Sequence, residues 1–168
     1  VHIILDLQDE EIIDVKSKYD ISDNKVNIIW EGMANNIKLF YDVSETLYEI
    51  NKVKPFNLNI ITDLTYPVGL GNYFKLNSSN VIKKILSDEI NFNLYEWNKY
   101  KLNEIALTSD IAIIPSSKKY DDMFIHKSSN KLLFFWKMGI PVLTSYSYAY
   151  EQAMKDTNLD FICRDNNE

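Results

Sequence analysis

Short apolar runs alternate along this chain with segments of helical periodicity, and this alternation constrains the fold more than any single motif. Asp110–Pro115 is almost continuously apolar, as strands buried on both faces of a parallel sheet are. Other strands are expected at His2–Leu5, Val26–Trp30, Leu58–Thr62, Ile90–Tyr95, Pro141–Ser145 and Asp160–Cys163. Helices are expected at Asn36–Asn51, Asn80–Leu86, Asn98–Leu107, Lys131–Met138 and Tyr150–Lys155, and Leu64–Ser79 is expected to be irregular. This order predicts an α/β fold, a Rossmann-like parallel β-sheet flanked by helices on both faces.

Composition narrows the class of protein. The 168 residues suffice for one domain, and the net charge of −6 comes without a basic stripe, which argues against nucleic acid as a partner. A single cysteine excludes an intrachain disulfide and a cysteine-based zinc cluster. The apolar runs are far shorter than the roughly 20 residues that span a bilayer. We therefore expect a cytoplasmic protein.

Both ends of the chain suggest a piece of a longer protein. Val1 is not an initiator methionine, and the last residues follow directly on a predicted strand. We expect residues 1–25 to be an inter-domain connection and edge segment. Residues 26–168 are expected to form the Rossmann-like domain itself.

The richest loop precedes the helix that is predicted to begin near Lys131. The first amides of a helix lack internal partners and, together with the helix dipole, favour an anion. Ser128, Ser129 and Asn130 add short polar side chains there, and Lys127 and Lys131 flank them. The alternative is that Ser128 or Ser129 only caps the helix, and the residues by themselves slightly favour that interpretation.

Three segments in this part of the chain carry a family resemblance. Asp110–Pro115 (DIAIIP), Lys127–Leu133 (KSSNKLL) and Gly139–Ser145 (GIPVLTS) occur in the order and spacing of one nucleotide-binding unit. They resemble the C-terminal, donor-binding domain of GT-B glycosyltransferases, related to the group 1 type. Trp30–Gly32 with Asn35-Asn36 resembles the first strand and glycine loop of the same domain. Two glutamates that many retaining members carry would fall on His126 and Phe134, so this chain departs from that subgroup.

The resemblance implies a function and a set of site residues. The domain would bind a nucleotide diphosphate sugar as substrate, with neither a cofactor nor a metal. The residues expected at the diphosphate are Gly32, Asn35, Ser128, Ser129, Asn130 and Lys131. The glycan or lipid-linked acceptor would bind through an absent N-terminal domain, and peripheral membrane association of the full-length protein stays open. No catalytic residue is assigned.

Further side chains are weaker candidates. Contacts with the nucleobase or the sugar are considered for Trp97, His126, Tyr148 and Tyr150. The alternative is ordinary packing for the aromatic residues and an exposed loop position for the histidine. Asp121-Asp122 could suggest a metal but fits a solvated turn better, and Cys163 is expected in inert core.

Two other functions remain open on the same architecture. The first is a sugar-nucleotide epimerase of the GT-B type, which would need acidic and histidine residues in its cleft. The second is a degenerate Rossmann-like module without activity, kept for protein interaction.

Overall fold

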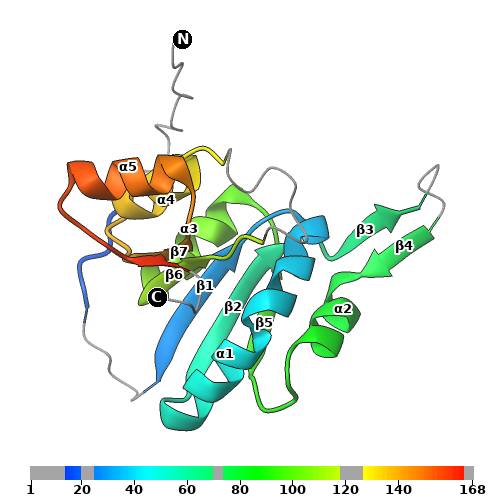
Figure 1. Cartoon of the computed structure of the whole chain (residues 1–168). Coiled ribbons are helices and arrows are strands. Elements are labelled where there is room, and N and C mark those ends of the chain that lie inside the picture. Colours follow the sequence, from blue (N-terminus) through cyan, green and yellow to red (C-terminus); the bar gives the residue numbers. More distant parts are fainter. Residues whose placement is uncertain (1–13, 20–24, 70–73, 118–126, 165–168) are drawn as a thin grey trace.

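Six parallel strands form the central sheet of the computed structural model, which describes residues 14–19, 25–69, 74–117 and 127–164 (Figure 1). Their order across the sheet is β5-β2-β1-β6-β7-β8. The strands are β1 (Val26–Glu31), β2 (Phe56–Thr62), β5 (Phe92–Glu96), β6 (Ile111–Ile114), β7 (Val142–Ser145) and β8 (Ile162–Cys163). The predicted parallel sheet is thus confirmed. Among these strands, the first and fourth along the chain lie side by side, so the order reverses between β1 and β6.

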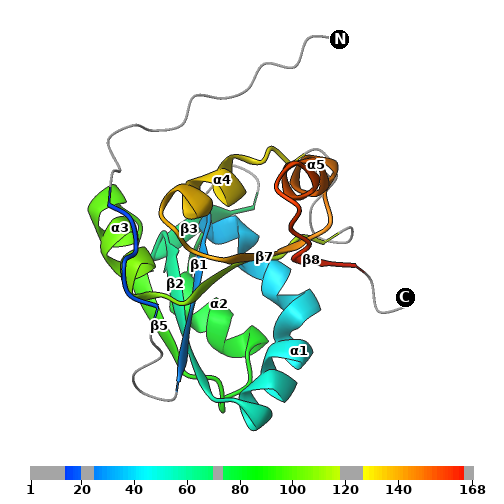
Figure 2. The ribbon, with the colours of Figure 1, turned by 90° about the vertical axis from the view of Figure 1, so that its left-hand side faces the viewer.

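Helices cover both faces of the sheet, as predicted (Figures 1 and 2). The 3-10 helix η1 (Ala34–Leu39), α1 (Phe40–Val53) and α2 (Ser78–Ile85) enclose one apolar cluster with β1 and β2. The helices α3 (Lys99–Thr108), α4 (Asn130–Lys137) and α5 (Tyr148–Asp156) enclose the other. Each helix turns a buried stripe to the sheet, for example Leu132 and Phe135 of α4.

The expectation for the segment between β2 and α2 was wrong. The segment Leu64–Ser79 is not irregular, because β3 (Thr65–Val68) and β4 (Phe74–Asn77) pair as an antiparallel hairpin. Tyr, Val, Phe and Thr favour strands, whereas Pro67 and Gly69 had indicated a loop. Gly69 has φ +82°, which suits the chain leaving β3. The helix α2 then begins at Ser78, since the Asn77 side chain accepts a hydrogen bond from the Asn80 amide.

The segment 14–19 packs on the amino edge of the sheet. The buried Lys16 donates from its backbone to the Met138 carbonyl (2.9 Å), and its ammonium pairs with Asp110 (3.1 Å). The second carboxylate oxygen of Asp110 accepts the Asn27 amide at 2.9 Å. Asp110, the first residue of the DIAIIP segment, is therefore a structural residue on the edge away from the carboxyl ends of the strands. The proposed division at residue 25 stays a prediction, and His2–Leu5 lies outside the described residues.

Tyr19 completes this contact at a tight turn. Its hydroxyl donates to the carbonyl of Gly139, or to that of Lys16, each at 3.0 Å. Gly139 has φ +74°, and a Cβ there would lie 2.6 Å from the Tyr19 hydroxyl oxygen. Backbone conformation thus favours glycine between α4 and β7, and a larger residue would also displace the Tyr19 hydroxyl.

Candidate anion site at the switch in strand order

The candidate site lies where the strand order reverses, at the carboxyl ends of β1 and β6. Chains leaving two such neighbours run to opposite faces of the sheet, which opens a crevice between them and makes it the usual ligand position of this fold. The loop after β1 and the start of α4 both lie at this end of the sheet (Figure 1). Both loops carry residues that are predicted at the diphosphate, Gly32 and Asn35 in the first and Ser128–Lys131 in the second.

Gly32 begins the loop after β1 and is held close to its neighbours. Its amide donates to the Ile61 carbonyl at 3.2 Å. A Cβ at this position would lie 2.8 Å from the ring of Trp30. That ring is buried and packs edge-on against Phe40, with 5.1 Å between ring centroids. A side chain at Gly32 would therefore displace a fixed indole rather than a flexible group.

Gly32→Ala is expected to lower the free energy of unfolding by about 1–3 kcal/mol, the usual cost of overpacking a buried position. Chemical denaturation monitored by circular dichroism measures this. Met33→Ala is the matched control, because Met33 is the exposed next residue. Equal stability of Gly32→Ala and the control would show that the Trp30 contact is not restrictive.

The start of α4 supplies the backbone amides predicted at this site. Ser129 occupies the N-cap position in helical conformation, and its side chain makes no capping hydrogen bond. Its carbonyl accepts the Leu133 amide at 2.9 Å, which is the first helical bond. The alternative of a plain cap is therefore not observed at Ser129. Ser128 is exposed, and Asn130 is the first helical residue.

Lys131 joins the start of α4 to the end of β1 across the switch in strand order. Its ammonium donates to the backbone carbonyl of Glu31 at 2.7 Å and lies 3.0 Å from the carboxylate of the same residue. Both side chains are half-buried. The structure thus brings Lys131 and the chain next to Gly32 together. The Glu31 carboxylate forms an ion pair with the Lys131 ammonium, and this pair reduces the positive charge that Lys131 can offer to a bound anion.

Glu31 is the site residue that sequence reasoning did not single out. In the sequence it is one of the three residues of the segment Trp30–Gly32, and the pattern assigns it no role of its own. Its position directly after the buried part of a strand was the available signal, because such positions line the ligand edge of a parallel sheet. What the sequence did not indicate is its partner, which lies 100 residues away.

Other polar groups occupy the same edge. The Ser116 amide donates to the Ser145 hydroxyl at 3.0 Å, which ties the ends of β6 and β7 together. The Asp63 carboxylate, beyond β2, accepts the Ala34 amide at 3.4 Å. Within the described ranges, the buried hydroxyls of Ser116 and Thr62 have no hydrogen-bond partner. These hydroxyls are further donors at the carboxyl ends of the strands.

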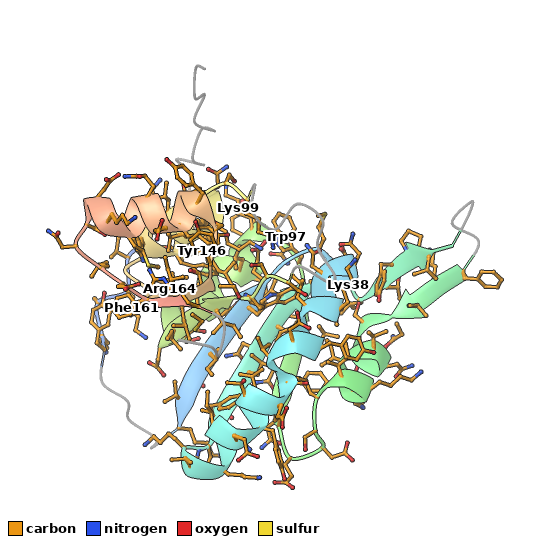
Figure 3. All side chains as sticks on the ribbon, viewed as in Figure 1. Lys38, Trp97, Lys99, Tyr146, Phe161 and Arg164 are labelled. Carbon is orange, nitrogen blue, oxygen red and sulfur yellow. The ribbon has the colours of Figure 1, made fainter. Side chains whose placement is uncertain are left out.

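The other residues predicted for the site lie at different distances from the switch in strand order, and they differ in exposure. Trp97 directly follows β5, is half exposed and lies near this edge with Tyr146 (Figure 3). The strand β2 lies between β5 and β1 in the sheet, so Trp97 is not at the switch in strand order itself. Asn35 is exposed in η1, and Tyr148 is exposed at the start of α5.

Tyr150 lies in the core, with 2% of its surface exposed, where packing accounts for it. Its placement follows from α5 beginning two residues earlier than expected, at Tyr148. His126 and Asp121-Asp122 lie outside the described residues. Lys127 is half-buried and makes interactions of its own.

Cys163 is in a strand, as expected, but it is exposed rather than in the core. Partial burial of the thiol raises its pKa, which lowers the thiolate fraction at neutral pH. In the described part of the chain, no group of three or more His, Cys, Asp or Glu is arranged to hold a metal ion. No helix there is both long and apolar enough to cross a membrane.

Comparison with known proteins gives only distant similarity, at the level of solved structures. No protein-family model matches the chain, and neither does any curated protein sequence. Among solved structures it is similar to the crystal structure of WaaG, a glycosyltransferase involved in lipopolysaccharide biosynthesis. The similarity has a TM-score of 0.48 and 13% identity, and it covers 87% of this chain and 35% of that one. This chain therefore spans only a minor part of that protein's length, and a likeness so distant carries no argument about the site.

Proposed function

We propose that this chain is the nucleotide-sugar donor-binding domain of a glycosyltransferase of the GT-B architecture. The observation that carries the proposal is the meeting of Lys131, the start of α4 and the Glu31–Gly32 turn at the switch in strand order. A helix start beside a glycine turn at that position is the arrangement by which this class of fold holds diphosphates. The sequence resemblance of the same segments supports the identity of the ligand.

The proposed function asks this site only to stabilise the negative charge of a leaving group. When a sugar leaves a nucleoside diphosphate, negative charge develops on the departing phosphate oxygen. The first amides of α4 and the Lys131 ammonium would stabilise that charge without reorganisation. The sugar acceptor and the catalytic base would belong to a domain outside this chain, with a glycan or lipid-linked molecule as acceptor. The chain alone is therefore expected to bind nucleotide weakly and to transfer nothing.

The proposal is tested by thermal unfolding of the chain in the presence of UDP, GDP, ADP or CMP. A ligand that binds only the folded state raises the unfolding temperature in proportion to the logarithm of its concentration over its Kd. We expect stabilisation by at least one nucleoside diphosphate and none by the corresponding nucleoside. If no nucleotide stabilises the protein at millimolar concentration, the donor-site proposal is wrong.

A second function, an interaction module that has lost its ligand, is favoured by two observations. Lys131 is neutralised by Glu31, and Phe134 stands where many donor-binding domains carry a glutamate. Such a module would give no nucleotide response in the same thermal experiment. The thermal unfolding experiment therefore distinguishes the two functions, because they predict opposite results.

Glu31→Gln is expected to raise the affinity for a bound nucleoside diphosphate about fivefold. The substitution removes a negative charge beside the phosphates, and such a charge at about 4 Å costs roughly 1 kcal/mol even with the screening of bulk water. Lys131 keeps its bond to the Glu31 backbone carbonyl, so it should stay in place. Isothermal titration of Glu31→Gln against Glu45→Gln, an exposed control on α1 with the same charge change, measures the effect. Unchanged or weaker binding in Glu31→Gln would place the phosphates elsewhere.

A further inference from the structure

The β3–β4 hairpin extends away from the body of the molecule, beyond the layers that enclose the two cores (Figure 1). In its register, Tyr66 is opposite Leu76 and Val68 is opposite Phe74. Opposed residues share a face and successive pairs alternate, so these four side chains form one face. We call it the apolar face of the hairpin. The other face carries Thr65, Pro67, Lys75 and Asn77.

The β3 side of this apolar face is partly covered, since Tyr66 and Val68 are half-buried, whereas its β4 side is exposed. Tyr66 is half-buried beside Tyr41, and burial raises the pKa of its phenol. Further out, Phe74 is 73% exposed and Leu76 is 40% exposed. A two-stranded ribbon with an open apolar face is marginally stable in water, and such faces usually serve for association.

The charge around the hairpin differs from that of the rest of the chain. From Leu64 to Leu86 the sequence contains no Asp or Glu and three lysines, whereas the whole chain has a net charge of −6. The lysines Lys75, Lys83 and Lys84 are all exposed. Lys38, from η1 beside the base of β3, adds a fourth positive charge nearby (Figure 3). The carboxylates next along the chain, Asp63 and Asp88, bound this basic stretch at its two ends.

We propose that the apolar face of the hairpin inserts into the interface of an anionic lipid bilayer, with Lys75, Lys83 and Lys84 at the headgroups. An aromatic and an aliphatic side chain side by side, with lysine on the opposite face, is the amphipathic pattern that lies in a membrane interface. A protein partner would need only the apolar face. The basic bias in an acidic chain selects an anionic surface, because each lysine near such a surface adds to the attraction.

The proposal does not depend on nucleotide binding, so the two can fail separately. It is tested by sedimenting the purified chain with vesicles of phosphatidylglycerol and phosphatidylcholine in equal parts, or of phosphatidylcholine alone. We expect binding to the anionic vesicles, weakened by added salt, and little binding to the neutral ones. Binding to both kinds alike, or to neither, would overturn the proposal.

Two sets of variants locate the contact. Phe74→Ser with Leu76→Ser is expected to weaken vesicle binding at least about tenfold, since both apolar side chains would leave the lipid. Tyr100→Ser is the matched control, because Tyr100 is a more exposed aromatic residue on α3. These side chains lie outside the core, so circular dichroism should report unchanged folding.

Two triple lysine variants with the same change in net charge test the electrostatic part of the proposal. Replacing Lys75, Lys83 and Lys84 by glutamine should weaken binding to anionic vesicles by on the order of 100-fold. Replacing Lys18, Lys137 and Lys155 changes the net charge equally on other exposed surfaces and should have little effect. Equal losses in both triple variants would overturn the proposal. So would a dimer that Phe74→Ser with Leu76→Ser dissociates while no vesicle is bound, because a second copy would then cover the face.

Discussion

Lys131→Ala should weaken binding of a nucleoside diphosphate by about 10–100-fold, the loss of one charge-assisted hydrogen bond of roughly 1.5–3 kcal/mol. Lys131 is the cation that the structure places at the switch in strand order, where it bonds to the Glu31 carbonyl. Once a diphosphate is bound, the same ammonium would lie between that carbonyl and the phosphate oxygens. Isothermal titration with the nucleotide that stabilises the protein most measures the change.

The control for this variant is on the same helix. Lys137→Ala removes an identical charge from the last turn of α4 and is expected to change affinity less than twofold, because it lies at the opposite helix end. Stability also needs to be compared, since Lys131→Ala breaks a half-buried ion pair with Glu31. Equal affinities of the two variants would mean that Lys131 holds Glu31 and not a phosphate.

Lys16→Met should lower the free energy of unfolding by about 3 kcal/mol. The Lys16 side chain is 5% exposed, and its ammonium is the cationic partner of Asp110, whose side chain is only 17% exposed. Removing one member of a buried ion pair leaves the other charge without compensation, at a typical cost of about 3–5 kcal/mol. We expect the lower end of that range because Asp110 keeps the Asn27 amide. Urea denaturation measures the loss.

The interpretation of Lys16→Met depends on two further variants. Lys18→Met alters an exposed lysine of the same segment and should change stability by less than about 0.5 kcal/mol. Combining Lys16→Met with Asp110→Asn removes both charges and should cost less than the sum of the single changes. Additive losses would show that the two side chains are not coupled, and that segment 14–19 contributes by packing alone.

Regular elements with strong local patterns could be predicted from the sequence. The strand at Ile111–Ile114 lies within the predicted apolar run, and α1 covers most of the helix predicted at Asn36–Asn51, whose first residues form η1 instead. Their pattern is local, since a strand buried on both faces needs a continuous apolar run. The parallel arrangement then followed from the alternation of strands and helices.

The hairpin was missed because its signals conflict. Pro67 and Gly69 within a short run indicate a loop, and the strands β3 and β4 do not belong to the main sheet. Nothing in the periodicity of a four-residue strand distinguishes it from an extended loop. The hairpin pairing itself, Tyr66 with Leu76, is a contact between strands and not a property of either one.

Ion pairs between residues far apart in the sequence could not be predicted from it either. Asp110 belongs to a segment that resembles a nucleotide-binding unit, yet its carboxylate pairs with Lys16, 94 residues away, at the amino edge of the sheet. Lys131 was predicted as a phosphate ligand without its partner Glu31. In both cases the residue was placed near the correct element, and its role depended on a contact that only the fold creates.

We expect a nucleoside diphosphate to bind between the turn at Gly32 and the start of α4. Amide chemical shifts from nuclear magnetic resonance, recorded on the isotopically labelled chain during titration with the most stabilising nucleotide, test it directly. We expect the largest shifts on the amides of Gly32, Asn130 and Lys131, and no change at the amide of Asp110 at the opposite edge. Saturable shifts that leave these three amides unmoved would contradict it.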